Sequence, residues 1–316
     1  MGADTAISWC QATWSPWEGC TKVSPGCDHC YAAGMNQWLR KGENWGPGAP
    51  RRQYSDEHWK KPLRWNAQAA RDGRRLTVFP SVCDPFDNEV DPAWRVRFFD
   101  LIAQTPNLTW LLLSKRVGNA SAMVKEAWRH DTAWPRNVWL GATVVNQEEA
   151  DRDIPKLLAV PARVRFLSVE PMLGPVNLQR WLWECCGNMQ LGNDHGLLGQ
   201  EPDSCCGNPD PRDALHWAIC GGESGHGARP LQVEWVRSIV KQCKAAGVPV
   251  HVKQLGKVVH TNGITRPGEH WPAGTAPWRQ VVLDSGDIAF AITLKHPKGG
   301  DPAEWGEDLR VQEFPA

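Results

Sequence analysis

The chain has 316 residues, of which 41% are hydrophobic and 22% are charged, and its 35 basic residues balance its 35 acidic ones. This composition is that of a folded globular protein and excludes a disordered or fibrous chain. The zero net charge removes any global electrostatic reason to bind nucleic acid, so such binding would depend on a local patch. No apolar run reaches the roughly eighteen residues of a membrane span, and the stretch MGADTAISWC lacks the features of a signal peptide. These two observations predict a cytoplasmic protein with no membrane partner.

Short apolar runs alternate with helix-like segments along most of the chain. A first strand is expected at residues 12–17, and six continuous apolar runs follow at 76–80, 108–113, 138–143, 164–169, 217–221 and 248–253. Helices are expected between them at 92–104, 120–129, 147–158 and 233–246. Continuous apolar strands that alternate with helices are typical of parallel β/α units. About seven such units predict an α/β fold, a partial (β/α) TIM-like barrel, with a doubly wound sheet as the alternative.

Two internal stretches and the tail interrupt this alternation. Residues 42–75 and 181–216 are predicted to be insertions on the rim of a barrel formed by residues 1–256. Residues 257–316, rich in Pro, Gly and Trp, are predicted to form a small C-terminal extension or cap. Within the first insertion, the basic segment from Arg51 to Arg75 is a candidate nucleic-acid surface, with Trp59 or Trp65 stacking on an exposed base. A solvated rim loop is the alternative.

Polar residues follow directly after the predicted strands. In a parallel barrel the carboxyl ends of all strands open on one face, and active sites lie on that face. Helix caps and ordinary loop polarity are the alternative explanation for any single residue. The residues of this candidate site are Ser81, Asp84, Ser114, Lys115, Asn146, Ser168, Glu170, Gly221, Gly222, Glu223, Ser224 and Lys253.

Three cysteines lie on the loop that follows the first predicted strand. Cys20, Cys27 and Cys30 form the pattern C-x6-C-x2-C. Three thiolates on a four-iron cluster leave one iron open, and that iron can chelate the amino and carboxylate groups of S-adenosylmethionine (SAM). A zinc site is the competing interpretation, because Cys₃His is a common zinc ligand set and His29 lies between two of the cysteines.

Four further cysteines lie in the second insertion, around His195. Together they predict a zinc ion or an auxiliary iron–sulfur cluster, and a loop that is incidentally rich in Cys is the alternative. These residues are Cys185, Cys186, Cys205 and Cys206.

The cysteine loop belongs to a longer stretch, TWSPWEGCTKVSPGCDHCYA, which is accompanied by FLSVEPMLGPV at 166–176 and GGESGHGARP at 221–230. Together these motifs resemble the phage-associated Gp37/Gp68 family of radical SAM-like proteins, and the resemblance covers nearly the whole chain. It implies a barrel of the radical SAM type with a [4Fe-4S] cluster on Cys20, Cys27 and Cys30. The chain departs from the usual C-x3-C-x2-C loop of that superfamily by three extra residues between the first two cysteines.

The resemblance also implies roles for the polar residues. Gly221 and Gly222 would let the backbone approach the cofactor closely, because no Cβ intervenes. Glu223, like Glu170, would accept from an amino or ribose hydroxyl group. The implied anion-binding residues are Arg229 and Lys115, which would bind a carboxylate or phosphate. For each residue, a tight turn or a buried ion pair at the barrel rim is the alternative.

The implied chemistry is reductive cleavage of SAM, with an electron from a flavodoxin- or ferredoxin-type donor. The resulting 5′-deoxyadenosyl radical would abstract hydrogen from a substrate. We expect this substrate to be a modified nucleotide in phage DNA, such as an amino-acid-modified thymine that is isomerised. The same radical acting on another nucleobase or on RNA is a second hypothesis. The third hypothesis is not catalytic, and describes a zinc-stabilised module that binds nucleic acid or protein.

Overall fold

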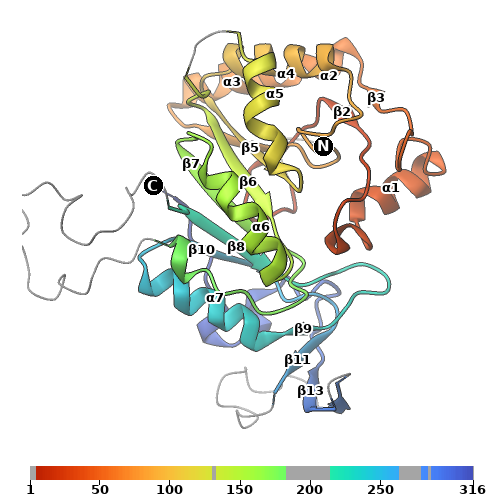
Figure 1. Cartoon of the computed structure of the whole chain (residues 1–316), viewed down its shortest axis with the longest axis vertical. Coiled ribbons are helices and arrows are strands. Elements are labelled where there is room, and N and C mark those ends of the chain that lie inside the picture. The colour runs from red at the N-terminus through yellow and green to blue at the C-terminus, as the bar shows by residue number, and fades with distance from the viewer. Residues whose placement is uncertain (1–4, 130–132, 183–213, 263–278, 284–285, 316) are drawn as a thin grey trace, which may run out of the picture.

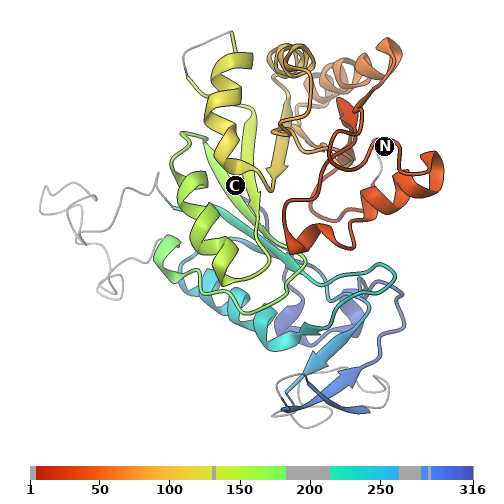
Figure 2. The same ribbon diagram turned by 45° about the vertical axis from the view of Figure 1, so that its right-hand side comes forward.

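A computed structural model describes residues 5–129, 133–182, 214–262, 279–283 and 286–315. A seven-stranded parallel sheet forms the centre and curls into a half-barrel (Figures 1 and 2). The strand order is β1 (Ala12–Thr13), β4 (Leu76–Phe79), β5 (Leu108–Ser114), β6 (Val138–Thr143), β7 (Val164–Val169), β8 (Trp217–Gly221) and β10 (Val250–Gln254). Neighbouring strands follow the chain order, as in a (β/α) barrel, so the predicted partial barrel is confirmed and the doubly wound alternative is wrong.

Helices cover the outer face of this sheet. They are α3 (Lys61–Asp72), α4 (Pro92–Gln104), α5 (Ala120–Ala127), α6 (Gln147–Leu158) and α7 (Val233–Ala245). Two begin at capping side chains: Asp91 accepts from the backbone N–H of Ala93 at 2.9 Å, and Asn146 accepts from that of Glu149 at 3.0 Å. The apolar sides of the helices and the outward residues of the strands make the larger of two buried cores.

The smaller core fills the inside of the half-barrel. Trp9 packs against Phe79 and Phe166, with ring centroids 4.5 and 6.3 Å away, and Trp217 lies beside them. A Cβ on Gly141 would lie 2.4 Å from the ring of Phe166, so only glycine leaves room for that ring. The polar residues after the strands therefore lie above an apolar filling.

Shorter elements complete the chain. Helices α1 (Tyr31–Arg40) and α2 (Asp56–Trp59) lie near a two-stranded ribbon of β2 (Trp17–Glu18) and β3 (Arg52–Gln53). A second sheet has the order β12 (Arg279–Val282), β13 (Ile288–Ile292), β11 (Val259–Thr261) and β9 (Leu231–Gln232). Single 3₁₀ turns are η1 (Pro25–Cys27), η2 (Val117–Asn119), η3 (Gln179–Trp181), η8 (Pro302–Glu304) and η9 (Glu307–Leu309).

The tail also pairs with the edge of the central sheet. Val252 donates its backbone N–H to the carbonyl of Val311 at 2.8 Å, and Glu313 donates to that of Val250 at 3.0 Å. These bonds add an antiparallel segment to β10, which would otherwise present unpaired backbone groups along this side. Within the described residues, no helix is both long enough and apolar enough to cross a membrane.

The predicted elements agree with this fold, with two differences. The strand expected at 12–17 is wrong in extent, because β1 ends at Thr13 and the chain crosses to β2, which pairs with β3 instead of the barrel. Pro16 lies between them and has no N–H to give a sheet. The segment 42–75 contains α3, which packs on β4 and β5 and connects the first barrel strand to the second. Most of the predicted insertion at 181–216 lies outside the described residues.

Candidate functional site

The cysteine loop runs between β2 and α1, over the carboxyl ends of the barrel strands. Its 3₁₀ turn is capped by Ser24, whose hydroxyl accepts from the N–H of Gly26 at 3.0 Å. Cys30 is the residue before α1 and takes an extended conformation there. Cys20, Cys27 and Cys30 are all partly exposed and free of disulfides. The three cysteines therefore carry free thiols on one short loop.

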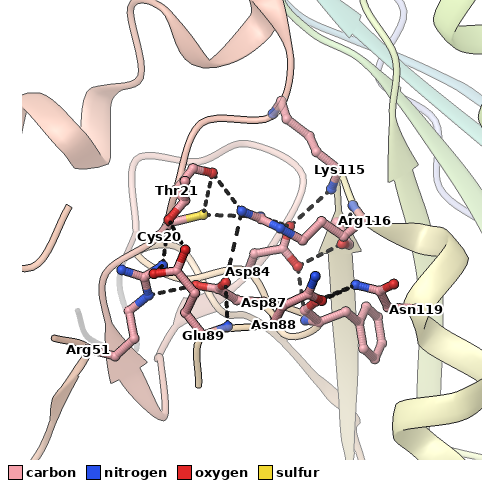
Figure 3. A network of polar contacts seen from close by, with 12 residues as sticks. Cys20, Thr21, Arg51, Asp84, Asp87, Asn88, Glu89, Lys115, Arg116 and Asn119 are labelled. Carbon is pink, nitrogen blue, oxygen red and sulfur yellow. Dashed lines mark hydrogen bonds and ion pairs between the residues drawn. The ribbon is translucent and has the colours of Figure 1, made fainter. Parts of the chain in front are cut away.

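Cys20 lies next to an arginine from the end of β5. Its Sγ is 3.4 Å from Nη1 of Arg116, and the same Nη1 is 3.2 Å from Oδ2 of Asp84 (Figure 3). Arg116 also donates through Nη2 to the carbonyl of Thr21 at 2.7 Å. Burial raises the pKa of the Cys20 thiol to about 12, the charge of Asp84 adds to this, and Arg116 opposes it. Cys20 is a neutral thiol here, so a metal that binds it must displace its proton.

Asp84 positions Arg116. Its carboxylate accepts from the hydroxyl of Ser114 at 2.7 Å and from the backbone N–H groups of Phe86 and Lys115 at 2.9 and 3.2 Å. Ser114 in turn accepts from the backbone N–H of Arg116 at 2.8 Å. The strand-end residues Asp84 and Ser114 thus lie together, and their bonds within the protein hold a guanidinium at Cys20.

Arg51, the first residue of the candidate nucleic-acid segment, is buried in an ion pair and cannot contact a phosphate. Its Nε donates to Oδ2 of Asp87 at 2.7 Å, and both side chains are only 1% exposed. Its Nη2 donates to the hydroxyl of Thr21 at 2.7 Å and to Glu89 at 3.2 Å (Figure 3). Trp59 is buried in the core, where a base cannot stack on it. Sequence reasoning missed this network, although the run of acids at Asp84, Asp87 and Glu89 was visible as a possible counterpart.

A second set of contacts attaches the loop to the end of β8. His29 Nδ1 is 2.9 Å from Oε2 of Glu223, and Arg229 pairs with the same carboxylate. Arg229 also donates through Nη2 to the carbonyl of Pro25 at 2.8 Å and through Nη1 to Asp28 at 3.3 Å. Burial raises the pKa of Glu223, but hydrogen bonds from Arg229 and His29 outweigh this and lower it to about 2. The carboxylate of Glu223 therefore connects the loop to the end of β8.

Glu170 and Lys253 lie together at the ends of β7 and β10. Lys253 Nζ is 2.5 Å from Oε1 of Glu170, and both side chains are partly exposed. Gln254 donates to the same oxygen at 3.4 Å and to the carbonyl of Gly222 at 2.9 Å. This pair leaves polar groups accessible at the mouth of the half-barrel.

The remaining predicted residues have local contacts. A Cβ on Gly221 would lie 2.8 Å from the carbonyl oxygen of Gln254, and one on Gly222 would lie 2.4 Å from that of Leu255. The two glycines thus let β8 and β10 approach each other, whatever else they contact. Asn146 caps α6, Ser168 is buried in β7, Ser224 is half-buried, and the carbonyl of Ser81 accepts from the hydroxyl of Tyr31. Asn146 therefore has the cap role that the sequence left as the alternative.

The side chains of the loop are of the kind that binds an iron–sulfur cluster, but they are not arranged to bind one in this structure. Three free thiols are the donors that such clusters take. In the described part of the chain, however, no three Cys, His, Asp or Glu side chains lie close enough together to hold a metal ion. Ligation by all three cysteines therefore requires their side chains to come closer together than they are here. The predicted second metal group at Cys185, Cys186, Cys205 and Cys206 lies outside the described residues.

Comparison with known proteins places the chain in a family. A family model described as a protein of unknown function (DUF5131) matches residues 4–295. No curated protein and no solved structure matches the chain. The match spans the barrel, the cysteine loop and most of the tail.

Proposed function

We propose that this chain, which belongs to the DUF5131 family, the phage Gp37/Gp68 family, is a radical SAM enzyme. The observation that carries the proposal is the position of the cysteine loop. Contacts through Arg116 attach its start to the end of β5, and contacts through Glu223 attach its middle to the end of β8. The three thiols therefore lie over the carboxyl edge of a parallel half-barrel, the edge where barrel enzymes bind their substrates.

Cys20, Cys27 and Cys30 would hold a [4Fe-4S] cluster with one open iron. When bound and reduced by a flavodoxin- or ferredoxin-type donor, it would supply the electron that cleaves the SAM sulfonium to methionine and a 5′-deoxyadenosyl radical.

The chain's own residues would orient the reactants. Arg116 lies between Asp84 and Cys20 and would offset part of the negative charge of the thiolates. Glu170 would accept from the amino or ribose groups of SAM, and Lys253 would bind its carboxylate. The filled inside of the half-barrel would keep water from below the reacting atoms.

As substrate we propose a modified nucleotide in DNA, such as an amino-acid-modified thymine that the radical isomerises. A base within a duplex must first be turned out of the stack, because the reacting atoms lie at the mouth of a barrel.

The test is anaerobic purification, analysis of iron, sulfide and zinc, and reduction with dithionite in the presence of SAM. We expect brown protein that forms 5′-deoxyadenosine, and a Cys27→Ala variant that forms none. Cys243→Ala is the matched control, because Cys243 is buried in α7 on the outer side of the sheet and should leave both iron content and turnover unchanged. Colourless protein with bound zinc and no nucleoside would contradict the proposal and favour the binding module.

A further inference from the structure

A pocket of 380 Å³ lies between α1 and the start of the half-barrel. One wall is a face of α1, where Tyr31, Met35 and Leu39 follow one another at a spacing of four residues. Thr13 of β1 and Ser81 after β4 form part of the opposite wall. Tyr31 directly follows Cys30, so the pocket is adjacent to the cysteine loop.

The polar end of the pocket holds two arginines around one carboxylate. Glu18 is nearly buried and accepts from Nε of Arg52 at 3.0 Å, Nε of Arg40 at 3.4 Å and Nδ2 of Asn36 at 2.7 Å. Burial raises the pKa of Glu18, but hydrogen bonds from Arg52 and Asn36 outweigh it and lower the pKa. The pocket wall thus carries two positive charges and one negative charge.

Both arginines have N–H groups that make no hydrogen bond to the described residues. Their side chains are 39% exposed for Arg40 and 31% for Arg52. Within the described residues, both Nη groups of Arg40 and Nη1 of Arg52 make no hydrogen bond. Arg52 is also held over the ring of Tyr54, with 4.4 Å between its guanidinium carbon and the ring centroid. A guanidinium held in place with free N–H groups is suited to a phosphate or carboxylate.

An apolar surface continues outward from the pocket. Tyr31, Met35 and Leu39 are all exposed in part, and Trp38 on the next turn of α1 is 83% exposed. Such an apolar stripe beside a cationic pocket matches a ligand that joins a flat ring to an anion. A nucleotide has this chemistry, and in a single strand a neighbouring base would find the indole of Trp38 as a stacking surface.

We propose that this pocket binds one nucleotide of a single-stranded or unpaired nucleic acid, with its ring against α1 and its phosphate at Arg40 and Arg52. The inference rests on the proposed function for the identity of the substrate, and it places the nucleic-acid surface at α1 and Arg52, so that Arg52 is the basic residue of the segment 51–75 that takes part. The remaining basic residues of that segment then have no part in binding.

The test measures anisotropy of a short labelled oligothymidylate on the full protein, purified anaerobically and left unreduced, with thymidine 5′-monophosphate as competitor. We expect Arg40→Gln and Arg52→Gln each to weaken binding of both probes about tenfold, and each to lower the salt dependence by about 0.7 in the log–log slope. Trp38→Ala should weaken binding of the oligonucleotide about tenfold and leave binding of the mononucleotide unchanged. Arg64→Gln is the matched control, because Arg64 is exposed on α3 and pairs with Glu57 there.

Unchanged affinity in Arg40→Gln and in Trp38→Ala would overturn the inference. Both residues are exposed enough to be replaced without unfolding the chain, so this outcome stays readable if Arg52→Gln is unstable. Displacement of the oligonucleotide by SAM would assign the pocket to the cofactor and overturn the inference as well. The binding assay involves no reduction and is therefore independent of the SAM cleavage assay. If the pocket binds the nucleotide but the reduced protein forms no 5′-deoxyadenosine from SAM, only the proposed function is contradicted.

Discussion

His251 of β10 is fully buried inside the half-barrel. Its Nε2 is 2.8 Å from the hydroxyl of Ser8, and its ring lies 6.3 Å from that of Trp217 and 5.2 Å from that of Phe314. Burial lowers the pKa of His251 to about 4, and the nearby charge of Lys253 adds to the effect. The folded chain therefore keeps this imidazole neutral at a pH where the unfolded chain is already protonated.

This difference makes stability depend on pH. The unfolded chain binds the extra proton below its ordinary pKa of 6.5, so the free energy of unfolding should fall by about 2 kcal/mol between pH 7.5 and pH 5 because of His251. The loss should stop near pH 4, where the folded protein is protonated too. Urea titrations at several pH values should show that the free energy of unfolding changes less steeply with pH in His251→Leu than in the wild type. The exposed His226 serves as a control, since His226→Leu should keep the wild-type slope. Equal slopes in all three proteins would contradict this account.

Single residues also show where sequence reasoning stops. Cys20, Cys27 and Cys30 are noticed in the sequence because of their spacing, and their role as cluster ligands stays a prediction. The basic character of Arg51 and the aromatic character of Trp59 carry no information about burial, and both residues are interior. An arginine in a polar stretch of sequence is expected to be exposed. Only the fold shows that Arg51 lies next to a carboxylate partner, Asp87, with which it is buried.

Among the elements, β8 and β10 approach each other closely at Gly222. An added Cβ would lie 2.4 Å from the carbonyl oxygen of Leu255, which belongs to the backbone and cannot rotate away. We expect Gly222→Ala to lower the free energy of unfolding by about 1–3 kcal/mol, measured by urea denaturation.

A matched substitution should have the opposite sign. Gly34 lies within α1 and nothing lies within 4 Å of an added Cβ. Gly34→Ala should therefore raise the free energy of unfolding by up to about 1 kcal/mol, because alanine favours the helix. If both substitutions lowered the free energy of unfolding equally, the close approach of the backbone at Gly222 would not explain the loss of stability.

The elements themselves were the most predictable part of the molecule. Strands β6, β7 and β8 and helices α4 and α6 have the predicted bounds, because continuous apolar runs and capping residues mark them locally. Their contacts were not predictable. His29 and Glu223 are 194 positions apart, and no local pattern states that the cysteine loop attaches to β8. For the same reason the sequence did not indicate the pocket beside α1, whose residues come from six separate stretches of the chain.

For the whole molecule, the tail protects one edge of the barrel. Ending the chain at Arg310 would remove the segment that pairs with β10 at Val250 and Val252. The exposed edge should lower the melting temperature by several degrees and promote aggregation, because unpaired backbone groups recruit other strands. Calorimetry and light scattering would measure the two effects. A control chain that keeps residues 311–313 and ends at Phe314 should behave as wild type, and equal aggregation of both would contradict the role of pairing.

The aromatic filling of the half-barrel also decides from which direction small molecules arrive. Trp217 is the first residue of β8 and Trp139 the second of β6, so the filling already starts at the opposite edge from the cysteines. Within the described residues, this filling closes the route through the half-barrel, while the loop that carries the thiols is partly exposed at the other edge. Any partner that docks over that loop, whether nucleic acid or electron donor, would thereby also shield the site from air.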